Sequence, residues 1–329
     1  VVGMEVIALD QLKDRYFEPG LLAKHLGRNP EPLREVSAFS RARLHPGVRV
    51  EQKGGALTIQ VADRGGGIGR VVVMVNGKER KADARGPDPD PKARALTITE
   101  DLDGDPRLLS GEENRVEVFA YNADGSLRSR GVTVVSAAEG EKPDPSLWAV
   151  VAGVSDYQGE ALDLRFAAKD AENFAAAARL AGKALFGEDR THVRVLSNEA
   201  ARRDEDLLAA LEDLRAARPG DVLLVYLAGH GVCEGDDFFY LTADAATADL
   251  SQPDVRDATT LSSAELIDAI KEIPALKQVL IFDTCSSGAF IDDLTGTRGL
   301  PSGHARALER LKDRTGTFVL AGCAADKVS

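Results

Sequence analysis

The hydrophobic pattern of residues 46–138 alternates with a period of two. Leu57, Ile59 and Val61 are separated by polar residues, and later segments of this part repeat the spacing. Such alternation is typical of strands that bury one face. Asn76-Gly77 follows the run VVVMV and favours a two-residue hairpin turn. We therefore predict a small all-β sandwich here, with an immunoglobulin-like arrangement as its expected form.

From residue 147 onward the pattern changes to near-continuous apolar strands that alternate with helices. The expected strands cover residues 147–157, 191–197, 221–231 and 278–283, and the expected helices cover 165–187, 204–220 and 262–273. A short hairpin-like segment covers residues 237–245. This alternation predicts an α/β domain whose mostly parallel sheet is covered by helices on both faces. In such sheets, ligands bind beyond the carboxyl ends of the strands.

Breaks between these patterns divide the chain into four parts. Residues 1–45 contain short helical pieces interrupted by Pro and Gly, which indicates a connector and not a core. The sandwich follows at residues 46–138, a charged linker with prolines at 139–146, and the α/β domain at 147–329. The chain begins at Val1 and not at a methionine, which favours a piece of a longer protein.

Composition narrows the classes of partner and location. The chain has 41 Lys and Arg against 53 Asp and Glu, a net charge of −12, which argues against nucleic-acid binding. No apolar run approaches the roughly 20 residues that span a bilayer, so we expect no membrane segment. Three widely spaced cysteines without a secretory signal predict reduced thiols in the cytoplasm.

The glycine-rich stretch DRGGGIG, residues 63–69, invites comparison with phosphate-binding loops. It fits neither G-x-G-x-x-G nor G-x-x-x-x-G-K-[ST], and a strand follows it where both motifs require a helix. We therefore predict a plain turn.

A histidine and a cysteine follow two of the expected strands. His230 lies between Gly229 and Gly231 after VLLVYLA, and Cys285 follows QVLIFDT, 55 residues later. If the strands are neighbours, imidazole and thiol converge at one edge of the sheet, as nucleophilic catalysis by a thiol requires. The N–H groups of Gly231 and Cys285 are candidates for an oxyanion hole. The alternative is a small buried cysteine and a histidine that only satisfies a polar contact.

The stretches YLAGHG and DTCSSG resemble the His and Cys motifs of caspase-like cysteine proteases, in particular the bacterial branch allied to metacaspases. WAVVAGVSDY and LRFAAKDAENF support this resemblance, which covers about residues 147–329. The resemblance implies a caspase-like fold, a His230–Cys285 dyad, cleavage of peptide bonds through a thioester, and chemistry that uses no metal.

The same resemblance implies an acidic pocket for the residue before the scissile bond (P1). Metacaspase-like members carry Asp two residues before the cysteine, which is Asp283 here, and a second pocket acid matches Asp170. Two carboxylates facing a cleft would favour Arg or Lys at P1 and repel acidic side chains. The alternative is that Asp170 caps its helix and Asp283 binds a nearby backbone amide.

Three features depart from the family pattern. Residues 315–325 resemble the fifth of six core strands. Three alternatives account for the sixth strand: it was cut off as a C-terminal fragment, it is disordered, or it belongs to another chain. Arg298 lies in a Gly-rich stretch where a protease of this specificity would cut itself; an uncut surface loop is the alternative. Calcium activates many metacaspases, and Glu234–Asp237 offers carboxylates to it, although such turns are usually only solvated.

Other nucleophiles and ligands are weaker candidates. Cys233 lacks the second Cys or His pair that a zinc site needs, and Cys323 lies in an expected strand. Ser286 and Ser287 lack the G-x-S-x-G elbow of serine hydrolases.

The sequence therefore supports three functional hypotheses in different classes. The first is a caspase-like cysteine endopeptidase with basic P1 preference, acting on protein or peptide substrates in regulated proteolysis, stress or defence signalling, with an upstream sensor module as a further partner. The second is a pseudoprotease that serves as an interaction scaffold. The third is a thiol hydrolase of small esters, which the acidic pair disfavours.

Overall fold

The chain forms two compact units. The computed structural model describes residues 5–36, 43–234, 236–286 and 302–322, and for Cys285 and Ser286 it describes the backbone. One unit comprises Val1–Glu18 and Leu33–Lys142, and the other Pro19–Pro32 and Pro143–Ser329. The short helices of the expected connector are therefore shared: η1 (Leu9–Leu12) and α1 (Lys13–Tyr16) belong to the first unit, and α2 (Leu21–His25) to the second.

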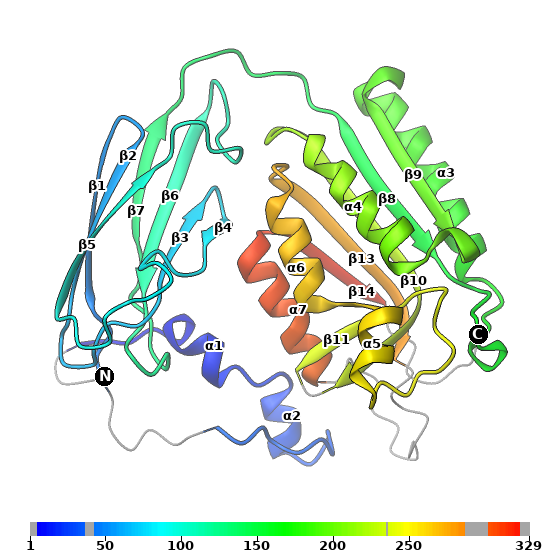
Figure 1. Cartoon of the computed structure of the whole chain (residues 1–329), viewed down its shortest axis with the longest axis horizontal. Helices are drawn as coiled ribbons and strands as arrows, with labels where there is room; N and C mark the ends of the chain where they lie inside the picture. Colours follow the sequence, from blue (N-terminus) through cyan, green and yellow to red (C-terminus); the bar gives the residue numbers. More distant parts are fainter. Residues whose placement is uncertain (1–4, 37–42, 235, 287–301, 323–329) are drawn as a thin grey trace. The chain divides into compact units, whose positions relative to one another are not determined.

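The first unit contains two antiparallel sheets around one core (Figure 1). Its strands are β1 Gly47–Lys53, β2 Ala56–Ala62, β3 Val71–Val75, β4 Lys78–Lys81, β5 Ala95–Asp101, β6 Glu113–Ala120 and β7 Val132–Ala137. The sheet orders are β1-β2-β5 and β4-β3-β6-β7. The alternating residues Leu57, Ile59 and Val61 point into the core and meet Val116 and Val118 of the facing sheet. The predicted pair of β-sheets is confirmed, while the immunoglobulin-like topology stays a prediction.

Two turns of this unit have the chemistry that their sequences predict. Asn76 and Gly77 have positive φ angles of 50° and 84°, which the tight β3–β4 hairpin requires. In the glycine-rich stretch, Asp63 Oδ1 accepts hydrogen bonds from the N–H groups of Gly65 (2.8 Å) and Gly67 (2.7 Å). Strand β3 follows this turn, as expected, and the Asp63 carboxylate occupies amides that a phosphate would need.

The second unit is built on a parallel sheet with a small antiparallel extension. Its elements are β8 Leu147–Gly153, η2 Glu160–Leu162, α3 Ala167–Phe186, η3 Glu188–Arg190, β9 Thr191–Ser197, η4 Asn198–Ala200, η5 Arg203–Leu208, α4 Ala209–Asp213, η6 Leu214–Ala216, β10 Val222–Glu234, β11 Asp237–Leu241, α5 Pro253–Thr259, β12 Thr260–Ser262, α6 Ser263–Glu272, β13 Lys277–Ser286, α7 Ser302–Thr315 and β14 Phe318–Gly322. The parallel strands lie in the order β9-β8-β10-β13-β14, and β11 and β12 extend the sheet from the end of β10.

Helices cover both faces of this sheet, as predicted. Helix α3 packs on one face, and α4, α6 and α7 pack on the other (Figure 1). Strand β10 is apolar on both faces, so both faces need a cover of helices. Leu223, Val225 and Leu227 pack in the cluster under α4, α6 and α7. Tyr226 and Ala228 pack in the cluster under α3.

Helical structure around residues 204–220 differs from the sequence expectation of one helix. A π-helical turn, the short α4 and a 3₁₀ turn succeed one another over Arg203–Ala216. The first of these turns is wide because the N–H of Leu207 donates to the carbonyl of Arg202, five residues earlier. Helix α6, by contrast, begins as its sequence predicts, with a reciprocal capping box between Ser262 and Glu265.

Candidate active site

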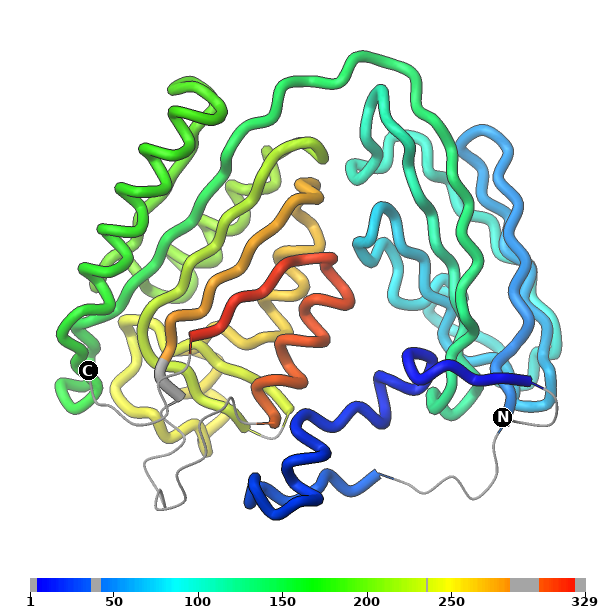
Figure 2. Tube along the Cα trace, turned by 180° about the vertical axis from the view of Figure 1, so that it is seen from behind, coloured from blue at the N-terminus to red at the C-terminus, as the bar shows by residue number. Residues whose placement is uncertain are grey.

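The two strands that carry the candidate dyad are neighbours. Strands β10 and β13 run parallel, and their register places His230 opposite Cys285 and Gly231 opposite Ser286. Figure 2 shows the two strands side by side. The expectation that His230 and Cys285 lie just beyond their strands is wrong, because β10 continues to Glu234 and β13 continues to Ser286. Strand β10 continues because β11 replaces β8 as its hydrogen-bonded neighbour from Gly231 onward.

The imidazole of His230 is fixed by a backbone group from another segment. Its Nε2 lies 2.8 Å from the carbonyl oxygen of Leu162, at the end of η2. A carbonyl oxygen can only accept a hydrogen bond, so Nε2 carries the proton of the neutral ring and Nδ1 is left as the acceptor. Nδ1 is buried and has no hydrogen-bond partner among the described residues. Burial lowers the pKa of His230, and the Leu162 hydrogen bond opposes that effect only in part.

The backbone around His230 depends on two glycines. The His230 N–H donates to the Tyr157 hydroxyl at 2.9 Å, and the two rings lie 5.3 Å apart. Gly229 has a φ of 147°, and a Cβ there would lie 2.7 Å from the Tyr157 hydroxyl oxygen. A Cβ on Gly231 would lie 2.4 Å from the ring of Phe238. Glycine is therefore required at both positions for space, and at Gly229 also for conformation.

The loop after β8, which contains the end of the stretch WAVVAGVSDY, brings two residues to His230. The Ser155 hydroxyl accepts a hydrogen bond from the N–H of Ala168 (2.9 Å) and so caps the start of α3. The Ser155 N–H in turn donates to Asn198 Oδ1 at 2.9 Å. These bonds fix the loop that brings Tyr157 and Leu162 to His230.

The acidic pair expected at the P1 pocket surrounds a tyrosine of β10. The Tyr226 hydroxyl donates to Asp283 Oδ2 at 2.8 Å, and both Asp283 and Asp170 are exposed. Burial raises the pKa of Tyr226, and the hydrogen bond to Asp283 and the charges of Asp283 and Asp170 raise it further. Neither carboxylate forms an ion pair within the described part of the chain, and Asp170 makes no side-chain cap on α3. Among the described residues, Asp283 accepts a hydrogen bond from this side chain and from no backbone amide, as the alternative interpretation would require.

The acidic turn considered for calcium is paired with arginines. Asp236 lies 2.6 Å from Arg306, and Asp237 lies 3.0 Å from Arg310, both on α7. Across the described residues, no group of three or more His, Cys, Asp or Glu side chains could hold a metal ion. Activation by calcium stays a prediction, and the candidate self-cleavage residue Arg298 lies outside the described residues.

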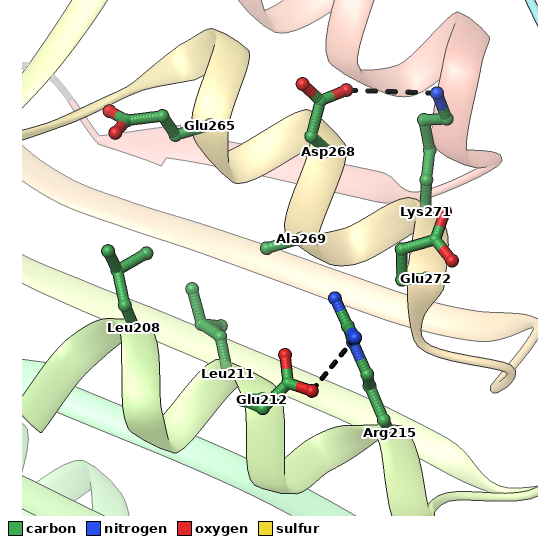
Figure 3. A pocket seen from close by; sticks show the side chains of 9 residues that line it. All are labelled: Leu208, Leu211, Glu212, Arg215, Glu265, Asp268, Ala269, Lys271 and Glu272. Atoms are coloured by element: carbon green, nitrogen blue, oxygen red, sulfur yellow. Dashed lines mark ion pairs between the residues drawn. The ribbon is translucent and has the colours of Figure 1, made fainter. Parts of the chain in front are cut away.

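A shallow groove between α4 and α6 lies apart from this site. Figure 3 shows an apolar floor that includes Leu208, Leu211 and Ala269, with charged side chains around it. The rim charges neutralise one another in ion pairs, Arg215 with Glu212 at 2.9 Å and Lys271 with Asp268 at 3.8 Å. The groove takes no residue from the carboxyl ends of β10 and β13.

Sequence reasoning missed three contributors to the site. Leu162 acts through its carbonyl, which any residue would supply, so no sequence signal marks it. Tyr226 lies inside an apolar strand and resembles a core residue. The signal that could have identified it is its polar hydroxyl group, on the same face of the strand as Ala228. Tyr157 belongs to a recognised stretch, but its contact with His230 depends on the fold.

A known protein family matches the C-terminal part of the chain. Residues 146–329, more than half of the chain, match the sequence model of the caspase domain family. No curated protein matches the chain.

In the described residues, no helix is both long and apolar enough to cross a membrane.

Solved structures give weaker similarities. A structural-genomics protein from Geobacter sulfurreducens is 21% identical with a TM-score of 0.34, over 44% of this chain and 52% of that one. The spore cortex lytic enzyme SleM of Clostridium perfringens is 18% identical with a TM-score of 0.20, over 28% of this chain and 27% of that one. The chain thus spans about half of the first structure and about a quarter of the second, and neither similarity carries a functional argument.

Proposed function

Because the chain belongs to the caspase domain family, we propose that it is a cysteine endopeptidase with Cys285 as nucleophile and His230 as acid and base. One observation carries the proposal: His230 lies opposite Cys285 in the register of β10 and β13, with its Nε2 held by the Leu162 carbonyl. The tautomer that this bond selects leaves Nδ1 to exchange a proton with the nucleophile.

The reaction proceeds in two acyl-transfer steps. The Cys285 thiol gives its proton to His230, and the thiolate attacks the peptide carbonyl carbon. The imidazolium then protonates the departing amine, and a thioester remains on the sulfur. Water, deprotonated by His230, attacks the thioester, releases the acid product and restores the thiol. The N–H groups of Gly231 and Cys285 are the proposed donors to the oxyanion.

The proposed P1 residue is Arg or Lys. Asp283 and Asp170 both act electrostatically on Tyr226, and no cation of the described residues pairs with either of them. An unneutralised pair of carboxylates favours a guanidinium or ammonium group and disfavours an acidic side chain. The family resemblance adds further parts to this proposal. They are protein or peptide substrates, a role in regulated proteolysis, stress or defence signalling, and activation by calcium. A C-terminal fragment or an upstream sensor module is the proposed partner.

The test uses matched fluorogenic peptides with Arg, Lys or Asp at P1, with and without calcium. We expect cleavage after Arg and Lys by the parent protein, abolished in Cys285→Ala and retained in the control Cys233→Ala. Asp283→Asn should raise KM for basic peptides, whereas Asp213→Asn, which changes a surface carboxylate of α4, should leave it unchanged.

Other results would redirect the assignment. Cleavage after Asp would contradict the basic pocket and retain the dyad. Activity that survives in Cys285→Ala would contradict the thiol mechanism. Lack of turnover in every condition, with peptide binding intact, would favour the pseudoprotease that acts as an interaction scaffold.

A further inference from the structure

The hydroxyl of Tyr226 engages one of the two carboxylate oxygens of Asp283 and not the other. The O–H donates to Oδ2 at 2.8 Å, so that oxygen is already engaged. Oδ1 faces Gly322 of β14, where a Cβ would lie 3.7 Å away. Since Gly322 has no side chain, the strand next to Asp283 leaves the second oxygen uncovered.

The position of Tyr226 is itself fixed by the sheet and by α3. Tyr226 is 5% exposed, and its ring stacks on Phe174 of α3 at 4.3 Å with an interplanar angle of 13°. The ring therefore has little freedom, and the hydroxyl is held at one point beneath Asp283. Removal of the hydroxyl alone leaves the stack in place.

We propose that Tyr226 is a positioning residue for substrate specificity: its hydroxyl holds Asp283 so that Oδ1, with Asp170, receives the cationic P1 side chain. This inference rests on the basic P1 preference proposed above. Tyr226 does not contact the reacting atoms in this role, since its hydrogen bond ends on the carboxylate. The environment of the hydroxyl, where the pKa of Tyr226 is raised, keeps it a hydrogen-bond donor throughout the neutral pH range.

The expected kinetic signature is a change in KM with little change in kcat for basic substrates. A free Asp283 side chain would sample other rotamers, and ordering it would oppose substrate binding. Loss of one hydrogen bond to a charged group corresponds to about a tenfold change in an equilibrium. We therefore expect Tyr226→Phe to raise KM for a P1-Arg peptide by about tenfold and to leave a P1-citrulline peptide, which is neutral and similar in shape, unchanged.

Binding measured without turnover separates this inference from the protease proposal. In the full chain carrying Cys285→Ala, fluorescence anisotropy would give the affinity of labelled P1-Arg and P1-citrulline peptides. We expect Tyr226→Phe to remove most of the preference for Arg, and Asp283→Asn to add little further loss because both act on one interaction. Tyr121→Phe is the matched control. Tyr121 also donates a hydrogen bond to a carboxylate, that of Asp14, and both residues belong to the first unit, not to the unit that carries Asp283.

A second variant tests the same pocket without changing Tyr226. In Gly322→Ala the new Cβ would be in ordinary contact with Asp283 Oδ1 at 3.7 Å, so the fold should tolerate it while the methyl group covers the oxygen. We expect this variant to reduce the preference for Arg as well. A preference for Arg that survives intact in folded Tyr226→Phe would overturn the role of Tyr226 and leave the basic pocket standing. Equal binding of Arg and citrulline by the parent protein would overturn the basic pocket, and with it this inference.

Discussion

His230 Nε2 lies 2.8 Å from the carbonyl oxygen of Leu162, a residue 68 positions earlier in the chain. This contact joins the segment after β8 to the carboxyl-terminal part of β10 and determines which ring nitrogen is left as the hydrogen-bond acceptor. The histidine that the sequence marks as catalytic is therefore oriented by a backbone atom that the sequence does not mark.

The pH dependence of peptide cleavage should reflect the burial of His230. Burial lowers the pKa of this histidine below its ordinary value of about 6.5. A lowered pKa keeps the neutral base at more acidic pH, so we expect the acid limb of kcat/KM to lie below pH of about 6.5. Stopped assays from pH 4 to 9 with a P1-Arg peptide would measure it. An acid limb above the ordinary histidine value would contradict this prediction.

Gly229→Ala should remove activity and destabilise the second unit. The residue would have to adopt a φ of 147° and place its Cβ 2.7 Å from the Tyr157 hydroxyl. Strain of this kind costs on the order of 1–3 kcal/mol, in addition to the displacement of Tyr157 from the His230 N–H. Thermal unfolding and peptide cleavage would be measured together. Gly220→Ala is the control, because Gly220 has open space around its Cβ position; equal behaviour of the two variants would exclude the steric argument.

Glu31 should stabilise the start of α7. Both of its carboxylate oxygens lie 3.2 Å from the N–H of Ser302, the first residue of that helix, and Lys24 pairs with the carboxylate at 3.3 Å. Burial would raise the pKa of Glu31, but the hydrogen bonds from Ser302 and Lys24 outweigh it and lower that pKa. We expect Glu31→Ala to reduce the free energy of unfolding by about 1 kcal/mol, as the loss of other helix caps does.

Urea unfolding of this variant would be compared with that of Glu35→Ala, an exposed glutamate of the same segment. An unchanged midpoint in Glu31→Ala, with Glu35→Ala also unchanged, would show that α7 does not need this cap.

Asp221 should make part of the stability depend on acid pH. It is 2% exposed and accepts hydrogen bonds from Ser146 N–H, Trp148 Nε1–H and Arg218 N–H. Burial opposes ionisation, yet these bonds prevail and lower the pKa of Asp221. Because the folded-state pKa is the lower one, the stabilisation is present above the unfolded pKa of about 3.9 and is lost as pH falls through the folded value.

The Asp221→Asn variant should therefore be less stable than the parent at pH 7, and the difference should shrink below pH of about 4. Thermal midpoints of both proteins at several pH values would test it. A difference that stays constant down to pH 2 would show that ionisation of Asp221 does not contribute.

The layered architecture could be read from the sequence because each element carries its own signal. The period-two pattern around Leu57 and Ile59 and the continuous apolar run of β10 reflect burial on one face and on two faces, respectively. Asn76-Gly77 and the Ser262–Glu265 capping box are local devices that need no partner elsewhere in the chain. The acidic character of Asp283 and Asp170, and the glycines beside His230, were visible for the same reason.

Other features depended on contacts between distant segments, and only the tertiary structure decided them. Strand β10 extends past His230 because β11 pairs with it where β8 ends, which no property of the strand's own residues indicates. The acceptor for His230 is a main-chain carbonyl, a group that every residue possesses. Tyr226 looks like a core residue until Asp283, from a neighbouring strand, is placed 2.8 Å from its hydroxyl. Local pattern thus determined the elements and the reactive residue types, while strand order and register determined which of those residues meet.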